Sequence, residues 1–267
     1  MVSLELTLIA AHLEGLEETI IHRLIDRAQF AANERAYRKG ESGFDGAGES
    51  SLFDMRLRYQ EEMDAAFGRY HVPEERPFHR SLPEPKRRVS LPENPLRIAD
   101  YDRVNLTREI VAEYTRRLPR LCRPSSRAAH APSGPSTPRT QTSDDDGQYG
   151  SSVEHDVLAI QAIARRVHFG ALYVAESKYL AMHERLDVLI EADDRPAILE
   201  LITRPEVERR ILTRVAEKVD YVQATINERV RRRIDPADVL DLYRDVIIPL
   251  TKEGELRYLS ARSTASA

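Results

Sequence analysis

Charged side chains lie beside apolar positions in the C-terminal half of the sequence. Arg166 belongs to the string ARRVHFG, Lys178 ends the string VAESK, and Glu208 belongs to PEVERRIL. Thr251 and Glu255 are four residues apart and therefore share one face of a helix. Taken singly, each charge has the ordinary interpretation of a salt bridge at the rim of the fold or a solvated helix flank. Taken together, charged groups that point inward could hold a small dianion.

Apolar residues repeat every three or four positions around these charges and predict the helices that position them. One predicted helix begins near Val153 and runs to Leu180, so it carries the first two charges. Another runs from about Pro205 to Arg229. The last begins at Asp235-Pro236, where an N-cap residue precedes a proline at the first helical position.

The same periodicity predicts further helices over residues 4–30, 52–69, 105–121, 184–192 and 195–202. Ser3 is the predicted N-cap of the first, and Phe53, Met63 and Phe67 are predicted core residues of the second. Six prolines between Pro73 and Pro95 predict an extended segment. No long stretch alternates like a half-buried strand. The predicted fold class is therefore all-α, a single-domain helical bundle.

Composition bounds the class of protein. The 267 residues include 40 basic and 44 acidic side chains spread along the chain, which does not favour a nucleic-acid partner. The single cysteine, Cys122, excludes an internal disulfide framework, and no Cys/His cluster has the spacing of a zinc site. Residues 123–149 are rich in Pro, Ser, Thr and Asp, so we predict a disordered insertion within one domain that spans residues 1–267.

The N-terminal residues carry no pattern of a signal peptide, because charged and polar residues interrupt their apolar positions. No stretch approaches the roughly 20 apolar residues that a membrane span needs. We therefore expect a cytoplasmic protein with no membrane partner.

Several long strings carry a resemblance to a known family: RRVHFG, VAESK, ITRPEVERRIL, VIIPLTKEGELRYL and the N-terminal LEETIIHRLIDRAQF. Through them the chain resembles the helical chorismate mutases of fungi and plants, over essentially its whole length except the 123–149 insertion. Members of that family rearrange chorismate to prephenate without a cofactor or a covalent intermediate. The resemblance implies that catalysis consists of positioning and electrostatics.

The resemblance also implies roles for the charged residues. Arg166 would bind a carboxylate of the substrate, and Lys178 would contact a carboxylate and the ether oxygen. Glu208 would bind the ring hydroxyl, and Thr251 would help to position the substrate. Glu255 would donate a hydrogen bond to the ether oxygen, which requires a protonated carboxyl, and burial beside a dianion would raise its pKa in that direction.

The chain departs from the family in its cations. Gly15 stands where the family carries an arginine for the second carboxylate, and Arg204 stands where the family carries an asparagine. Arg204 precedes Glu208 by four residues and so lies on the same helix face, from which it could replace the missing cation. It could equally flank the start of the helix or pair with Glu208.

The spacing of the two catalytic cations also differs. Arg166 and Lys178 are twelve residues apart, about 120° out of phase on a straight helix, whereas the family's eleven-residue spacing is about 20° out of phase. A π-bulge between Gly170 and Tyr173 would absorb the extra residue. Without such a bulge, Ser177 would face the pocket in place of Lys178.

Regulation is expected at a dimer interface, since fungal relatives bind tyrosine or tryptophan there. Arg69, Gly150 and Ser151 match residues of that effector site. Gly68 stands in place of a second arginine, and Asp235 in place of a threonine switch. The resemblance thus implies a homodimer with an altered effector response.

Three functions are compatible with these observations. The first is a cofactor-free, dimeric chorismate mutase, and the second is a catalytically silent paralogue that binds aromatic amino acids or regulates a partner enzyme. The third, a helical scaffold, would have no need of inward charges.

Overall fold

The computed structural model describes residues 4–122 and 145–262. Within these ranges every regular element is a helix, as the apolar periodicity predicts, and no strand is present. The elements are α1 (Leu6–Arg27), η1 (Glu34–Tyr37), α2 (Leu52–Ala66), η2 (Arg69–His71), η3 (Tyr101–Val104), α3 (Thr107–Leu121), α4 (Tyr149–Phe169), η5 (Gly170–Val174), α5 (Ala175–Glu191), α6 (Arg195–Ile202), α7 (Pro205–Ala224), α8 (Pro236–Leu242), η6 (Tyr243–Ile247) and α9 (Ile248–Ala261).

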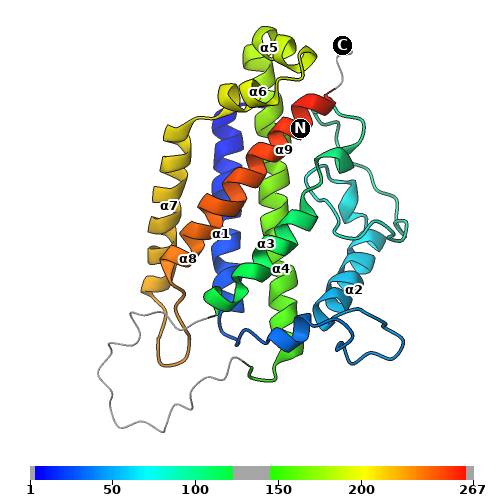
Figure 1. Ribbon diagram of the computed structural model, residues 1–267, viewed down its shortest axis with the longest axis vertical. Helices are drawn as coiled ribbons and strands as arrows, with labels where there is room; N and C mark the ends of the chain where they lie inside the picture. Colours follow the sequence, from blue (N-terminus) through cyan, green and yellow to red (C-terminus); the bar gives the residue numbers. More distant parts are fainter. Residues whose placement is uncertain (1–3, 123–144, 263–267) are drawn as a thin grey trace.

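The continuous helix formed by α4, η5 and α5 is the axis of the bundle. It runs along the length of the molecule beside α1, while α3 and α9 cross in front of it and α7 forms one flank (Figure 1). This arrangement brings α1, α4 and α9 together around η5, the turn where α4 passes into α5. Residues that are up to about 240 positions apart in sequence can therefore meet at this level.

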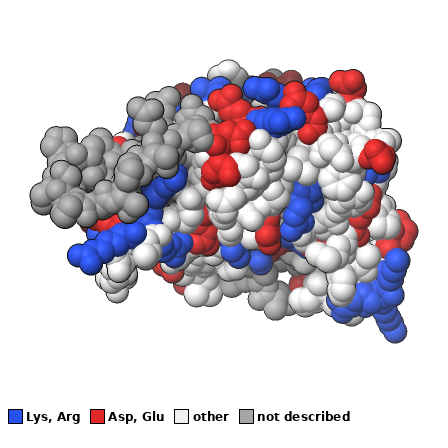
Figure 2. Space-filling view, turned by 90° about the horizontal axis from the view of Figure 1, so that it is seen from below, with Lys and Arg blue, Asp and Glu red and all other residues white. Residues whose placement is uncertain are grey.

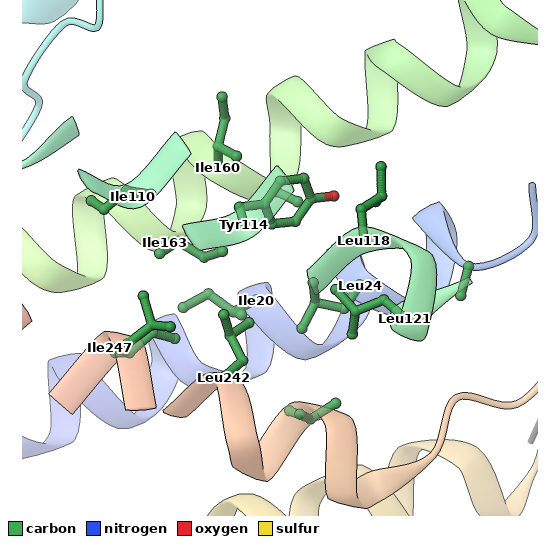
Figure 3. Packing of buried hydrophobic residues seen from close by; sticks show 14 of the residues in the cluster. Ile20, Leu24, Ile110, Tyr114, Leu118, Leu121, Ile160, Ile163, Leu242 and Ile247 are labelled. Atoms are coloured by element: carbon green, nitrogen blue, oxygen red, sulfur yellow. The ribbon is translucent and has the colours of Figure 1, made fainter. Parts of the chain in front are cut away.

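Two clusters of buried apolar residues hold these helices together. The larger one joins α1, α3, α4 and the α8–η6 segment, and Figure 3 shows Ile20 and Leu24 of α1 beside Tyr114 and Leu118 of α3. The smaller cluster joins η5, α5, α6 and the end of α9. At about 25 cal/mol for each Å² of buried apolar surface, these clusters supply the main stabilisation of the bundle.

A buried ion pair lies inside the larger cluster. Arg27 and Asp156 are 1% and 0% exposed, and Arg27 Nε donates to Asp156 Oδ1 across 2.7 Å. The hydroxyls of Tyr37 and Tyr114 also donate to Asp156. Because both charges are paired and hydrogen-bonded, this pair links α1 and α4 without leaving an uncompensated charge in the core.

Several local expectations are confirmed. α6 occupies residues 195–202 as predicted, and α8 begins after Asp235, whose side chain accepts a hydrogen bond from Ala237 N at 3.0 Å. The π-helical turn η5 lies at Gly170–Val174, where the phase of the two cations requires an extra residue. Helix 184–192 proves to be the end of α5, beyond a kink at Met182.

Other expectations are wrong. Met63 and Phe67 are 50% and 68% exposed, so they are not core residues, although Phe53 is. α1 begins after Glu5, whereas the predicted cap Ser3 lies outside the described residues. Of the predicted insertion, residues 123–144 also lie outside the described residues.

The last residues of that predicted insertion belong to the ordered fold. Asp146 accepts hydrogen bonds from Ala31 N and Asn33 Nδ2, at 2.8 and 2.9 Å, and α4 begins at Tyr149.

The helix Tyr149–Glu191 is long and apolar enough to cross a membrane, contrary to the expectation from the sequence. However, 78% of its apolar window is buried inside the protein, as in the core helix of a globular protein. On the face seen in Figure 2, basic and acidic side chains are interspersed over the described surface, which agrees with the even charge distribution of the sequence.

Candidate active site

Arg166 is a buried cation that lacks a partner. Its side chain points from the last turn of α4 into the interior and is 3% exposed. Its Nε and Nη1 atoms are buried and make no hydrogen bond within the described residues. Burial lowers the pKa of the Arg166 guanidinium, and the nearby Tyr243 and Glu17 oppose that shift. A buried guanidinium with two unused donors is strongly unfavourable unless an anion completes its hydrogen bonding.

The π-helical turn places Lys178 on the side of Arg166. One extra residue in η5 gives the twelve-residue interval the phase of eleven residues in a regular helix. Lys178 Nζ accordingly lies 2.6 Å from Glu255 Oε2 and 2.8 Å from the Ile202 carbonyl oxygen. Ser177 faces elsewhere, since its hydroxyl donates to the Leu4 carbonyl at 2.9 Å.

Glu255 is a buried carboxyl between these cations. It lies on α9 and is 4% exposed. Burial raises the pKa of Glu255 above its ordinary value, while Lys178, Arg166 and Lys252 oppose the rise. Because its pKa is raised, the Glu255 carboxyl stays protonated to higher pH than it does in water. Glu255 can therefore act as a hydrogen-bond donor.

Thr251 is held close to Arg166 by a glycine. A Cβ atom on Gly170 would lie 2.7 Å from Thr251 Cγ2 and 3.2 Å from Arg166 Nη1. Only glycine therefore allows α9 to approach η5 this closely. The Thr251 hydroxyl donates to the Ile247 carbonyl at 2.7 Å, which is the usual bond of a threonine inside a helix.

Glu208 lies in the first turn of α7 and pairs with Lys252 of α9. The Lys252 Nζ–Glu208 Oε1 distance is 2.9 Å, and the two side chains are 27% and 29% exposed. Thr251, Lys252 and Glu255 thus bring α9 into contact with the residues of three other elements. The five predicted catalytic residues are placed around one end of α9.

Arg204 does not pair with Glu208. It is the exposed N-cap residue of α7, and its guanidinium makes no hydrogen bond or ion pair among residues 4–122 and 145–262. Arg204 therefore lies at the start of the helix without contacting Glu208.

Gly15 lies on the side of α1 opposite the residues that approach Arg166. It is exposed on α1, and an added Cβ would meet nothing within 4 Å. The α1 residues that approach the site are Leu13 and Glu17, and each is two positions, or about 200°, away from Gly15 around the helix.

The predicted effector residues are not brought together within one chain. Arg69 is bound by Asp64 and Glu75 at 2.8 and 2.7 Å, and Gln161 in the middle of α4 also donates to Asp64. Gly150 and Ser151 are exposed in the first turn of α4, about 16 Å along the helix from Gln161.

Gly68 cannot carry the second arginine in this backbone. It has a φ of +84°, and a Cβ there would lie 2.3 Å from Val89 Cγ2. The residue ends α2 in the left-handed conformation that glycine adopts without strain.

Two residues that lie near Arg166 were not predicted from the sequence. Glu17 is fully buried and accepts from Arg214 Nε and Nη2 at 2.9 and 2.8 Å. Tyr243 is also fully buried beside Arg166. Glu17 lies four positions from Leu13 and three from Ile20, so the signal that singled out Arg166, a charge within an apolar stripe, was present there too.

Comparisons with known proteins find relatives along most of the chain. No protein-family model matches the chain. A chorismate mutase of Trichoderma parareesei is 34% identical over 266 residues, which cover 97% of this chain and 94% of that protein. Among solved structures, a chorismate mutase from Candida albicans in complex with L-Trp superposes with a TM-score of 0.83 at 29% identity, covering 97% of this chain and 92% of that one. AtCM1 with tyrosine bound in its allosteric site superposes with a TM-score of 0.74 at 32% identity, covering 96% and 95% of the two chains.

Proposed function

The chain belongs to the family of helical chorismate mutases, and from this premise we propose that its buried cations bind chorismate and promote its rearrangement to prephenate. The reaction is intramolecular: an ether C–O bond breaks while a C–C bond forms, so no atom or electron is exchanged with the protein. The enzyme has to hold the compact conformer and stabilise the charge that develops on the ether oxygen.

The observation that carries this proposal is the unpartnered guanidinium of Arg166. Its free Nε and Nη1 atoms are charge-assisted donors on opposite sides of the guanidinium, and a carboxylate oxygen is a suitable acceptor for either of them. In the ligand-free chain no carboxylate of the described residues takes that place, and the substrate would supply one. Thr251, whose methyl group lies against Gly170 beside Arg166, limits where that carboxylate can lie.

Lys178 and Glu255 are proposed to serve the ether oxygen. They contact each other at 2.6 Å, so an oxygen atom that approaches this pair would meet an ammonium donor and a carboxyl side by side. The raised pKa of Glu255 keeps a proton available for that bond. Two donors that are preorganised away from water stabilise a developing oxyanion more than solvent does.

The remaining polar residues are proposed to orient the ring. Glu208 would accept a hydrogen bond from the ring hydroxyl. Arg204, exposed at the start of the same helix and free of internal partners, would supply a cation to the second carboxylate. No cofactor enters this scheme.

The proposal is tested by adding the purified protein to chorismate and following the loss of substrate absorbance. Arg166→Ala should slow turnover by about 10²- to 10³-fold, the scale of one lost oxyanion or carboxylate donor. Arg165→Ala is the matched control, because Arg165 is the adjacent arginine but its side chain is 41% exposed and faces Glu74 and Glu75. Turnover by the Arg166 variant at the rate of the control would overturn the assignment.

A silent paralogue has no support from the comparisons, in which the relatives are named as chorismate mutases. Its characteristic feature was the glycine at position 15, which faces solvent rather than the site.

We also propose a cytoplasmic homodimer that binds tyrosine or tryptophan as effectors. The relatives crystallised with L-Trp and with tyrosine support the effector class. Arg69 and the pair Gly150 and Ser151 lie too far apart in one chain to share a small ligand, which supports a site completed by a second copy. An effector carboxylate would have to compete with Glu75 for Arg69, so titration of each amino acid against turnover tests this part.

A further inference from the structure

Lys252 is a further cation near the site, and the family resemblance assigns it no role. It follows Thr251 on α9, and its ammonium lies 2.9 Å from Glu208 Oε1 on α7. It also acts on Glu255, whose pKa it helps to hold down after Lys178 and Arg166. Among the described residues Glu208 is the only ion-pair partner of Lys252. The pair joins two helices at the mouth of the site, 44 residues apart in sequence.

The charge of the substrate gives this pair a purpose. The proposed function sets a dianion against Arg166, Lys178 and Arg204. Glu208 adds a negative charge to the same site and, without Lys252, would reduce the net positive charge that meets the two negative ones. A carboxylate that approaches an uncompensated carboxylate is repelled, and in a partly buried site solvent screens that repulsion poorly.

We propose that Lys252 is a positioning residue that neutralises Glu208 and so allows a carboxylate to serve the ring hydroxyl beside a dianionic substrate. The ammonium binds Oε1 and leaves Oε2 for the substrate, which fixes the direction in which Glu208 accepts a hydrogen bond. Lys252 thus acts through Glu208 and not by direct contact with the substrate. This inference rests on the proposed function and adds to it a residue that determines how the site tolerates its own acidic group.

The two side chains are partly exposed, so the ordinary interpretation is a rim salt bridge of little consequence. The two interpretations predict different activities for the variant in which both Lys252 and Glu208 are changed. If Lys252 only screens Glu208, removing the negative charge should repair the loss of the lysine, because the repulsion between Glu208 and the dianion is then removed as well. If the Lys252–Glu208 pair is only a rim salt bridge, removing Lys252 should not lower kcat/KM, and the second substitution has no loss to repair.

The experiment compares kcat and KM for chorismate at low ionic strength in four proteins: the parent, Lys252→Met, Glu208→Gln and the double variant. Lys252→Met should lower kcat/KM by about 10-fold or more, mostly through a higher KM, on the scale measured for losing one partner of a close charge pair. The double variant should exceed Lys252→Met by at least about 3-fold, because glutamine keeps a hydrogen-bond acceptor without the charge.

Two controls separate this outcome from damage to the fold. Arg257→Met removes a cation of α9 with a similar exposure, 30%, whose ion-pair partners Glu109 and Glu253 lie outside the site, so Glu208→Gln should not improve it. Lys252→Arg should retain most of the parent's kcat/KM.

Two results would overturn the inference. In one, the double variant is no better than Lys252→Met, which would indicate direct contact of Lys252 with the substrate. In the other, Lys252→Met equals the parent, which would make the pair an incidental rim contact. An inactive parent protein would instead refute the proposed function, so the two failures are distinguishable.

Discussion

Glu255 is the residue whose titration should be visible in the reaction. Burial raises its pKa, and the proposed role requires the protonated form. Activity should therefore be complete below the raised pKa and should fall as pH rises through it, because an ionised carboxylate repels the charge that develops on the ether oxygen. The pH profile of kcat should show this alkaline limb.

Substitution separates this titration from that of other groups. Glu255→Gln keeps a donor that does not titrate, so it should flatten the alkaline limb and retain appreciable turnover. Glu255→Ala should cost about 10²- to 10³-fold in kcat, the scale of one lost oxyanion donor. A glutamine variant with the parent's pH profile would remove Glu255 from the proton-bearing role.

At the scale of elements, the π-helical turn η5 decides which side chain of α5 enters the site. Inserting one alanine between Val174 and Ala175 should rotate the following residues by about 100° and bring Ser177 to the place of Lys178. Deleting Val174 removes the extra residue, so a regular helix would keep Lys178 in phase with Arg166. We expect the insertion to abolish turnover of chorismate and the deletion to retain much more of it.

Circular dichroism of both variants provides the control, because each should remain helical. Equal losses of activity in two folded variants would show that the phase of Lys178 is not what η5 provides. The half-buried position of Val174 limits the packing that its deletion disturbs.

At the scale of the whole molecule, α2 carries an apolar surface that the described residues leave largely exposed. Tyr59, Met63 and Phe67 are 50%, 50% and 68% exposed, and their spacing of four residues places them on one helix face. Such a stripe beside Arg69 is the expected dimer surface, because a second copy that covers it would also approach the effector residues.

Met63→Glu should therefore convert the proposed dimer to a monomer, as measured by light scattering, since it places a charge in the expected apolar interface. The response to tyrosine or tryptophan should be lost with it. Val188→Glu is the matched control, since Val188 is 65% exposed on α5, at the other end of the molecule from α4's first turn. A Met63→Glu protein that remains dimeric would exclude the α2 stripe as the interface.

The sequence by itself determined the features that depend on neighbours along the chain. Apolar residues at helical spacing specify an all-α fold, and Asp235-Pro236 specifies the start of a helix because cap chemistry is local. The π-helical turn could also be predicted, since the phase of Arg166 and Lys178 on one helix follows from counting residues. The catalytic residues are predictions of the resemblance, and the packing around α9 brings Lys178 to Glu255 and Lys252 to Glu208.

The tertiary structure decided what depends on residues that are distant in sequence. Met63 and Phe67 continue an apolar pattern but lie on a face of α2 that no other helix within residues 4–122 and 145–262 covers, and periodicity alone does not say which faces are covered. Gly15 lies on the side of α1 opposite Leu13 and Glu17, and the packing of α1 on α4 decides which side meets the site. The Lys252–Glu208 pair exists only because α9 crosses the start of α7, and such a crossing is set by the packing of the whole bundle.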